Sequence, residues 1–460
     1  MSDRENRDTD DDDDEGYPPM ELVENGYFTS NVENSDSSDD EGNDDDPDSY
    51  PSNDGEFDRD LPTTHRYLGK LDSVTGYTLY DDGEVMNILA IYTTTMVFPG
   101  FTLPLVMNTS EETSIMQTFI EKNNVFVLLC ANSILDGIFN FGVTMEIFET
   151  QMLDNVLNIK ARGRQRCQLV SGTEVKSWTG RLKQVTIKIK AEPEISSPLC
   201  DTQMVSLKQK RLLMSSQFSD ILKNYKFRRY HLAQYPLASW LYDRYEVCYY
   251  VKILLEGLAH YVGGNLFIFL LLKSRLNFFF QEYIPNDPVK LSYWFVQNYQ
   301  LSHEERLDIL KLNSTLERLK LECKYLTYER IICCSRCNAN ITDPTKVFAM
   351  SKDGIQSNYV NPGGHVYETV TVLEAQNFRL NGNPSKQFSW FPGYAWTTMQ
   401  CKSCANHLGW RFTSTNLRPQ SFYGLAKIGI KVIIYKKIDS KDEEEINSRP
   451  TSFTRDYIPA

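Results

Sequence analysis

Continuous and alternating apolar runs dominate the chain between Asn87 and Glu192. The runs are rich in β-branched and aromatic residues and are separated by turn residues, which is typical of buried strands. They are "NILAIYTTTMVF" (87–98), "PGFTLPLVM" (99–107), "NNVFVLLCA" (123–131), "FGVTMEIFET" (141–150), "VLNIKARGRQRCQLVSG" (156–172) and "RLKQVTIKIKAE" (181–192). One segment, "SEETSIMQTFIEK" (110–122), has a helical period instead, with Ser110 as its expected N-cap. The pattern predicts a compact β-rich subdomain with one helix.

The apolar spacing becomes helical from about Thr202. Five apolar positions there share one helical face: Leu212, Leu213, Phe218, Ile221 and Leu222. The region is also basic, but solvent-facing charges on a helix are commoner than a nucleic-acid interface, and no base-stacking motif accompanies these charges. Further on, Ser302 and Glu305 form a capping-box signature before "RLDILKLNSTLERLKLECKYL" (306–326), which we interpret as one helix leading to the cysteines.

Charge is distributed unevenly along the 460 residues. Residues 1–60 contain 24 Asp and Glu against 3 Arg, a net charge of 3 − 24 = −21, so the remaining 400 residues carry 45 − 37 = +8. So few apolar groups accompany this charge that we predict a disordered acidic tail. A tail of this kind is a solvated arm, a partner-binding segment or a phosphorylation platform at Ser35, Ser37 and Ser38.

The apolar runs are too short for a membrane span. The longest, "LFIFLLL" from Leu266 to Leu272, has 7 residues, whereas a bilayer needs about 20. The start "MSDRENRDTDDDDDE" also lacks the features of a secretion signal. We therefore expect an intracellular, soluble chain, in which cysteines serve as metal ligands more often than as disulfides.

Two C-x-x-C pairs, Cys334 with Cys337 and Cys401 with Cys404, predict a metal site. Four thiolates at this spacing suit a closed, tetrahedral, structural zinc site with about 2.3 Å between zinc and sulfur. The 63 residues between the pairs exceed the spacers of common zinc modules, so the ion would join two ends of a small domain. Cys333 in place of Cys334, or His407 as a ligand, remains an alternative, and a redox pair is disfavoured because no βαβ pattern surrounds the cysteines.

Three tryptophans, Trp390, Trp396 and Trp410, lie within 25 residues that include the second C-x-x-C pair. Clustered aromatic residues usually form core. Here a "PGY" turn and the cysteine pair separate the three indoles, which also suits an aromatic cage. Because no acidic residue lies between Phe388 and Phe412, such a cage favours a neutral planar ligand over a cation.

These motifs resemble the cereblon family. "YVNPGGHVYETVTV", "FSWFPGYAW", the C-x-x-C pairs and "GWRF" look like its thalidomide-binding (CULT) domain, and "FPGFTLPL" with "ARGRQRC" looks like its Lon N-terminal domain. The similarity runs in order from about Leu61 to about Gly429. It implies an α+β chain with four parts: an acidic tail (1–60), a Lon N-terminal-like domain (84–329) with a helical adaptor-binding region at about 202–326, an all-β zinc domain of the β-tent type (329–436) and a C-terminal tail (437–460).

The resemblance also implies a function. Family members are substrate receptors of a cullin-4 RING ubiquitin ligase, in the nucleus and cytoplasm, held by the adaptor DNA-damage-binding protein 1, and they bind glutarimides and other cyclic imides that mark proteins for degradation. It implies one structural Zn²⁺ on Cys334, Cys337, Cys401 and Cys404. The ligand-binding residues that it implies are the walls Trp390, Trp396 and Trp410, the floor Phe412, and the rim residues Phe388 and Asn361. The two other interpretations are a binding module outside any ligase and a scaffold whose tryptophans are core.

The chain departs from the family pattern at three places. Phe388 and Gly363 stand where family members carry histidine, and "GGNLFIFLLLKSRLNFFFQ" (263–281) has no counterpart, as an insertion or an error in the gene model. The Lon resemblance does not imply a protease, because the sequence has no G-x-x-x-x-G-K-[ST] loop and no peptidase segment. It also has no RING-like array of eight metal ligands, so we expect a receptor without catalysis of its own.

Overall fold

The structure is a computed structural model that describes residues 55, 57–69, 71–74, 78–132, 137–153, 155–170, 176–179, 181–193, 241–242, 244–261, 284–285 and 287–437. All of these belong to one compact unit, Ser52–Ala460. The predictions for residues 1–54, for the apolar helix face at 212–222 and for the segment 263–281 lie outside the described residues. Within them, no helix is both long and apolar enough to cross a membrane.

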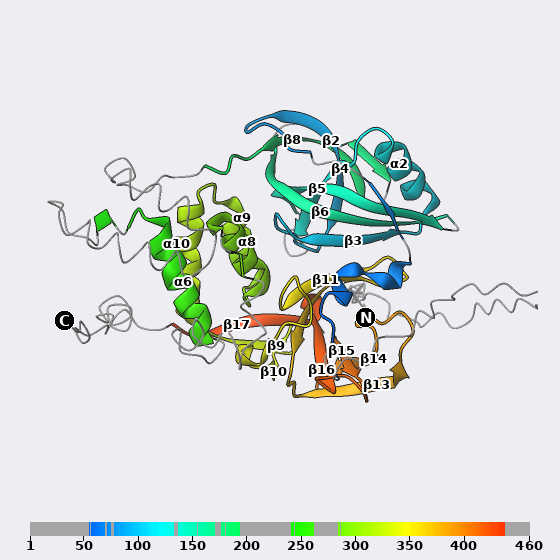
Figure 1. The fold of residues 1–460 in the computed structure, drawn as a ribbon, viewed down its shortest axis with the longest axis vertical. Coiled ribbons are helices and arrows are strands. Elements are labelled where there is room, and N and C mark those ends of the chain that lie inside the picture. Colours follow the sequence, from blue (N-terminus) through cyan, green and yellow to red (C-terminus); the bar gives the residue numbers. More distant parts are fainter. Residues whose placement is uncertain are drawn as a thin grey trace, which may run out of the picture. The chain divides into compact units, whose positions relative to one another are not determined.

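The N-terminal part is a β-sheet with one helix, as the apolar pattern predicts (Figure 1). Its elements are β1 (Asp72–Ser73), β2 (Val85–Thr93), β3 (Thr102–Met107), α2 (Ser110–Ile120), β4 (Val125–Asn132), β5 (Gly137–Leu153), β6 (Val156–Leu169), β7 (Lys176–Thr179) and β8 (Leu182–Ile189). The strand order is β1-β5-β4-β2-β8-β6-β3, and a further pairing of β5 with β6 closes five of these strands into a ring. Closure leaves the ring without free edges.

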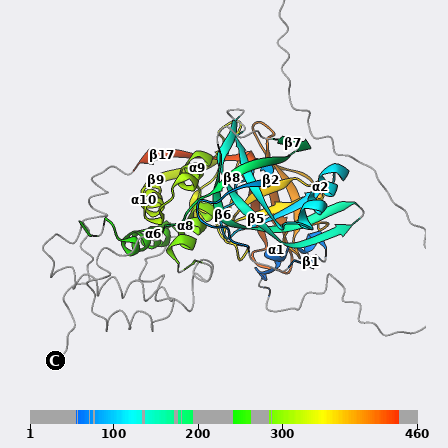
Figure 2. The same cartoon turned by 90° about the horizontal axis from the view of Figure 1, so that it is seen from above.

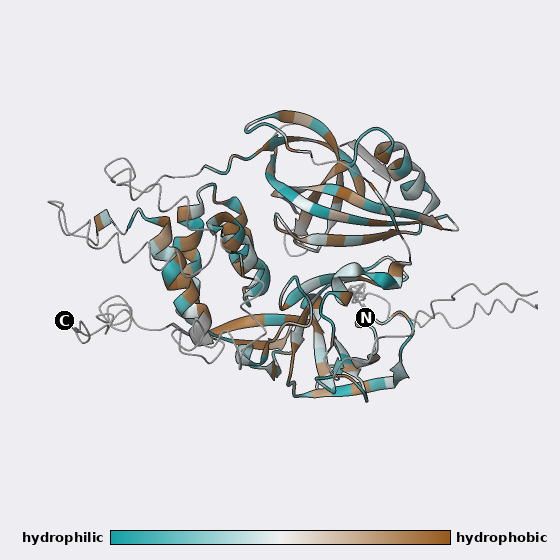
Figure 3. Cartoon of the chain, viewed as in Figure 1, coloured by the Kyte–Doolittle hydropathy of each residue, from teal (hydrophilic) through white to brown (hydrophobic). Residues whose placement is uncertain are grey.

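Strand β2 shows why these segments read as continuous apolar runs. Leu89 and Ile91 contribute to one hydrophobic core, whereas Ile88 and Ala90 contribute to another on the opposite face. Side chains alternate between the two faces of a strand, so a strand covered on both faces needs apolar residues at every position. Figure 3 shows apolar residues interspersed with polar ones along the longer strands β5 and β6.

In the part of the chain that the structure describes, the helices with given bounds that follow are α6 (Val247–Tyr261), α8 (Pro288–Asn298), α9 (His303–Lys311) and α10 (Thr315–Leu326). Helix α10 contacts the other three, and the four lie side by side in Figures 1 and 2. The capping box is present, because Ser302 Oγ accepts from the Glu305 amide at 3.2 Å and Glu305 Oε2 accepts from the Ser302 amide at 2.8 Å. The N-cap expected at Ser110 is wrong by one residue, because Ser110 is already helical and extended Thr109 precedes it.

The single helix expected over 306–326 is wrong, because the chain breaks between α9 and α10. Leu312 and Ser314 are extended, with ψ angles of 129°. Two buried arginines satisfy the carbonyl groups that the break exposes: Arg166 donates to the carbonyls of Leu310 and Leu312, and Arg318 donates to that of Leu312 at 3.3 Å. Arg166 is distant in sequence and Arg318 belongs to α10 itself, and together they stabilise a break that the local apolar spacing does not indicate.

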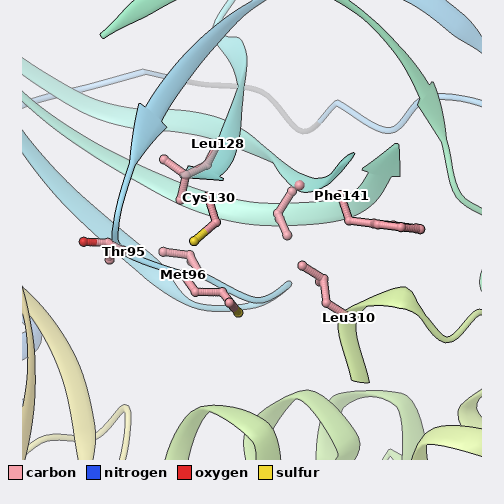
Figure 4. A pocket seen from close by; sticks show the side chains of 9 residues that line it. Thr95, Met96, Leu128, Cys130, Phe141 and Leu310 are labelled. Atoms are coloured by element: carbon pink, nitrogen blue, oxygen red, sulfur yellow. The ribbon is translucent and has the colours of Figure 1, made fainter. Parts of the chain in front are cut away.

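A small void separates α9 from the sheet (Figure 4). Its volume is about 10 Å³, and Leu310 extends toward Met96 and Phe141 across it. Burial raises the pKa of the Cys130 thiol in its wall to about 12. A void of this size holds at most about one water molecule, so this seam is packing and not a ligand site.

The C-terminal part consists of two antiparallel sheets. One has three strands in the order β10-β9-β17, and the other has six in the order β11-β12-β16-β15-β14-β13. Their strands are β9 (Tyr328–Cys334), β10 (Asn340–Thr342), β11 (Gln356–Val360), β12 (Val366–Val372), β13 (Phe378–Ser385), β14 (Ala395–Cys401), β15 (His407–Thr413), β16 (Ser421–Ala426) and β17 (Ile430–Lys437), with 3₁₀ turns η3 (Pro344–Lys346) and η4 (Lys427–Gly429). Gly409 has φ +138°, and a Cβ there would lie 2.0 Å from the Gly424 carbonyl oxygen, so only glycine allows β15 and β16 to pair this closely.

Buried ion pairs join the helices to the C-terminal sheets. Arg306 of α9 donates both of its terminal nitrogens to Glu368 of β12, at 2.9 and 3.2 Å, and Arg330 of β9 does the same to Glu305, at 2.6 and 2.8 Å. The arginine side chains are about 1% exposed. Fork-shaped pairs of this kind fix orientation, because a guanidinium matches a carboxylate only in one plane.

A short N-terminal segment, with helix α1 (Leu61–Thr64) and the 3₁₀ turn η1 (Arg66–Leu68), packs against the C-terminal part. Phe57 joins an aromatic cluster with Phe391 and Tyr394, and the Tyr67 hydroxyl accepts from the Val360 amide at 3.2 Å. His65 is 3% exposed, has φ +51° and lies 2.9 Å from the Tyr67 hydroxyl through Nδ1.

Burial first, and Lys160 second, lower the pKa of His65 to about 3. A lowered pKa means that the unfolded chain binds the proton more readily, so the stability from neutral His65 is complete above pH about 6.5 and is lost as the pH falls toward the folded pKa. We expect the unfolding free energy to fall less steeply between pH 6.5 and 4 in His65→Asn, by up to about 1.4 kcal/mol per pH unit. Asparagine tolerates the left-handed backbone and keeps an acceptor but does not titrate. Urea unfolding at several pH values measures the slopes, and identical slopes contradict the assignment.

Candidate metal centre and aromatic site

The four predicted cysteines meet in the structure. Their sulfur atoms all lie within 4.8 Å of one another, with 3.6 Å between Cys334 and Cys404 and 3.5 Å between Cys337 and Cys401. Four sulfurs at about 2.3 Å from a tetrahedral zinc would be about 3.8 Å apart, close to these separations. A set of four thiols without a carboxylate fits zinc, because soft sulfur ligands select it over calcium or magnesium.

The two C-x-x-C pairs form equivalent turns. In each, the first cysteine's amide donates to the carbonyl five residues later (Ala339 and Asn406, both 2.8 Å), and its carbonyl accepts from the amide four residues later. That fourth residue has positive φ in both turns, +60° at Asn338 and +58° at Ala405. Burial would raise the pKa of Cys334, but the amides of Cys337 and Arg336 and the neighbouring thiols lower it to about 7. Both turns therefore have the backbone pattern of metal-binding knuckles, and the lowered pKa favours thiolate at Cys334.

The two alternative ligands lie apart from this cluster. Cys333 is buried on β9, where it pairs with Asn340 and Lys431 in the strand ladder. His407 begins β15, and its ring contacts Trp410, with 4.8 Å between the ring centroids. Neither residue belongs to the four-sulfur group.

Trp396 and Trp410 lie on the six-stranded sheet that also carries Cys401, and Trp390 lies in the loop before β14. Trp396 on β14 is opposite Phe412 on β15, and Trp410 is two residues before Phe412, so these three share one face. Trp390, from the preceding loop, meets Trp410 edge to face with 4.6 Å between the ring centroids. Trp396 packs against the same cluster and is partly exposed, as is Trp410.

The indole nitrogens of Trp390 and Trp396 each donate a hydrogen bond to a backbone carbonyl. Trp390 Nε1 donates to the Val360 carbonyl at 3.2 Å, and Trp396 Nε1 donates to the Gln387 carbonyl at 2.8 Å. Trp390 is 7% exposed and stacks on Tyr359, with 5.0 Å between centroids and 11° between planes. Trp390 is thus largely a core residue, whereas Trp396 and Trp410 are partly exposed to solvent.

The other predicted site residues occupy different depths. Phe412 is 2% exposed and lies between Phe391 and Phe422 in the core beneath the tryptophans. Phe388 is 52% exposed with φ +53°, an uncommon conformation for a bulky residue that is often kept at ligand sites. Asn361 Oδ1 accepts from the His365 amide at 2.8 Å and shapes the turn that carries Gly363.

Two tyrosines beside the tryptophans were missed from the sequence. Tyr359 and Tyr367 are opposite each other on β11 and β12, and Tyr367 contacts both Trp390 and Trp410, with 5.9 and 4.9 Å between centroids. The sequence could have indicated that they are neighbours, because they stand at the two ends of the turn-containing stretch "YVNPGGHVY". Burial raises the pKa of Tyr367, and burial followed by His365 lowers that of His407 to about 4, so the surroundings are uncharged at neutral pH.

Comparisons with known proteins agree with this architecture. Residues 85–328 match the model of the ATP-dependent protease La (LON) substrate-binding domain, and residues 330–446 match the model described as Yippee zinc-binding/DNA-binding /Mis18, centromere assembly. The fold and the cysteine cluster therefore define a class of protein in which a Lon-type substrate-binding domain is joined to a Yippee-type zinc-binding β domain.

Relatives that align with most of the chain identify its family more narrowly. It is 32% identical to protein cereblon of Gallus gallus, over 81% of this chain and 84% of that protein, and 30% identical to protein cereblon of Xenopus tropicalis, over 85% and 87%. It is 29% identical to protein cereblon of Drosophila pseudoobscura pseudoobscura, over 82% of this chain and 59% of that longer protein. The chain belongs to the cereblon family.

Proposed function

We propose that this protein is the substrate-recognition component of a cullin-4 RING ubiquitin ligase, with DNA-damage-binding protein 1 as its adaptor. Family membership supports the assignment, and one observation carries it: Trp390 meets Trp410 edge to face and Trp396 packs against the same aromatic cluster, in a domain that also holds the four-cysteine cluster. The chain's own task is binding. Transfer of ubiquitin belongs to the partners, in keeping with a Lon match that covers a substrate-binding domain.

The proposed ligand is a cyclic imide, as a protein end group or as a glutarimide-type small molecule. A flat, neutral ring suits indole faces, and the neutral His407 and Tyr367 nearby offer no charge to attract an ion. The proposed ligand-binding residues are Phe388, Trp390, Trp396, Trp410, Phe412 and Asn361. Phe412 supports the pocket from beneath, and the backbone near Phe388 and Trp390 provides hydrogen bonds for the imide edge.

The proposed cofactor is one structural Zn²⁺ held by Cys334, Cys337, Cys401 and Cys404. Four thiolates leave no position open for water, so zinc would supply cross-linking rather than catalysis. The cysteines stand at the ends of β9 and β14 and in the turns that follow, which belong to different sheets. The ion would therefore fix the sheet that carries Trp396 against its neighbour.

The proposed adaptor surface is the helical region at about 202–326, of which α6, α8, α9 and α10 are described. By family resemblance we place the protein in the nucleus and cytoplasm. The apolar segment 263–281 interrupts the adaptor region in sequence, and it lies outside the described residues.

We expect the purified full-length chain to form a complex with purified DNA-damage-binding protein 1 in size-exclusion chromatography. Trp396→Ala should bind the adaptor equally well, because Trp396 lies in the C-terminal sheet and not in the helical region. A chain without residues 263–281 is the second arm, and binding by this variant alone would assign the interference to that segment. If neither chain binds the adaptor while the full chain still binds an imide, the protein is a recognition module outside a ligase.

A further inference from the structure

A second cavity, of about 550 Å³, lies away from the tryptophans. Its walls come from β3, β5 and β6 of the N-terminal sheet, from the segment 63–69 together with Leu71, and from the loop before β11. The charged side chains that line it are four basic and two acidic: Arg66, Lys160, Arg162, Lys352, Glu149 and Asp353. The lining thus carries an excess of 4 − 2 = 2 basic groups. The cavity volume lies within the roughly 300 to 1,000 Å³ of small-molecule sites.

The two lysines already have partners. Lys160 Nζ lies 2.6 Å from Glu149 Oε2 and donates to the Thr64 carbonyl at 2.6 Å. Lys352 Nζ lies 3.4 Å from Asp60 Oδ2. These contacts fix the walls of the cavity and account for one of its two acidic groups.

The two arginines are different. Among the described residues, Arg66 and Arg162 have no ion pair and no side-chain hydrogen bond, and both are exposed to solvent. The Arg162 guanidinium lies 5.5 Å from the centre of the Phe148 ring, which holds it at the cavity wall. Burial raises the pKa of Asp353, whereas Arg162 and Lys352 lower it, and this single carboxyl group cannot neutralise both arginines.

The hydroxyl groups of the cavity favour a ligand bound through the arginines. Thr63 Oγ1 donates to the Asp60 carbonyl at 2.7 Å, and Thr64 Oγ1 donates to the Leu61 carbonyl at 2.6 Å. The hydroxyl hydrogens of these two threonines are thus in use, and Thr102 is the third threonine of the lining. Phosphate oxygens accept hydrogen bonds and do not donate them when ionised, and the guanidinium fork is the side chain best matched to them.

We propose that this cavity binds a small molecule carrying a diphosphate group, held by Arg66 and Arg162. Two guanidinium groups in the lining of one cavity, neither of them in an ion pair among the described residues, suit a ligand with two negatively charged phosphoryl groups. The apolar side chains of Leu71 and Phe148 line the same cavity and give room for a non-phosphate part of the ligand. Because the ligand touches three parts of the chain, its binding stabilises their contact.

Isothermal titration of the full-length chain with inorganic pyrophosphate, and then with ADP, tests this proposal at constant ionic strength. We expect Arg66→Gln and Arg162→Gln each to weaken pyrophosphate binding about tenfold or more. Arg379→Gln is the matched control, because Arg379 is an exposed arginine on β13, outside the cavity, and its loss changes the net charge equally. This control should leave binding within about twofold, and circular dichroism should show all three variants folded.

Several results overturn the proposal. It fails if the wild-type chain does not bind pyrophosphate at millimolar concentration, if the double variant of Arg66 and Arg162 binds normally, or if Arg379→Gln weakens binding as much as the cavity variants do. Inorganic phosphate that binds as tightly as pyrophosphate overturns the diphosphate assignment. Tighter binding of ADP than of pyrophosphate supports contact with Leu71 and Phe148, and equal binding assigns the affinity to the phosphates alone.

Discussion

Replacing Cys337 with serine will release the metal and unfold the C-terminal sheets. Structural zinc contributes about 10 to 16 kcal/mol of apparent binding free energy in zinc-finger peptides, whereas a whole domain is stable by only about 5 to 15 kcal/mol. The four sulfurs lie within 4.8 Å of one another, so without the ion the remaining thiolates would also repel. Zinc content by atomic absorption, followed by tryptophan fluorescence and thermal unfolding, measures the loss.

Cys333→Ala is the matched control for this variant. Cys333 is the neighbour of Cys334 and is buried, but its side chain is outside the four-sulfur group. We expect one zinc per chain and a cooperative unfolding transition to remain, with a loss of about 1 kcal/mol from the missing sulfur. A chelator added to the wild-type chain should reproduce the Cys337→Ser result. Full folding of Cys337→Ser without metal would show that strand pairing alone holds the two sheets.

Much of the fold could be predicted because its signals are local. The continuous apolar run at 87–98 predicts a buried strand. In the structure, Leu89 and Ile88 enter two cores on opposite faces of β2, which explains why the run is continuous. The break between α9 and α10 could not be predicted in this way, because one of the two arginines that stabilise it is distant in sequence. Arg166 comes from β6, more than a hundred residues earlier, and its partners are backbone carbonyls that no residue type identifies.

The candidate site divides in the same manner. Cysteine spacing predicts the four-sulfur cluster because both turns of the site are built within six residues, through the same amide and carbonyl pattern. The positions of Tyr359 and Tyr367 could not be predicted, because they depend on the pairing of β11 with β12. This pairing places the two tyrosines opposite each other and both against Trp390. The depth of each aromatic residue depends on sheet stacking, so the sequence could not separate the buried Phe412 from the exposed Phe388.

Phe388 is exposed, and its side chain bears on which ligand the proposed site would bind. Its backbone has φ +53°, and the preceding carbonyl, of Gln387, accepts from Trp396 Nε1 at 2.8 Å. The backbone beside Phe388 and the orientation of the Trp396 indole are thus linked through a single hydrogen bond. A phenylalanine side chain offers no hydrogen bond, so backbone groups and ring faces would bind the proposed ligand at this position.

We expect Trp396→Ala to abolish imide binding while the protein stays folded. Trp390→Ala should lower both the imide affinity and the free energy of unfolding. Trp396 is partly exposed, so its removal takes away a ring face with little effect on the core. Trp390 is 7% exposed, stacks on Tyr359 and donates to the Val360 carbonyl, so its truncation should cost about 3 to 5 kcal/mol of stability. Titration of the full-length chain with a glutarimide, followed by tryptophan fluorescence, measures binding, and urea unfolding measures stability.

Trp396→Phe separates the ring face from the hydrogen bond. Phenylalanine keeps an aromatic face but cannot donate to the Gln387 carbonyl, so we expect imide binding to weaken about tenfold rather than disappear. Zinc content should remain at one per chain in all three variants if Trp396 is a cage wall. Unfolding of Trp396→Ala, with loss of zinc, would instead show that the tryptophans are core, and unchanged imide affinity in a folded Trp396→Ala would place the ligand elsewhere on the chain.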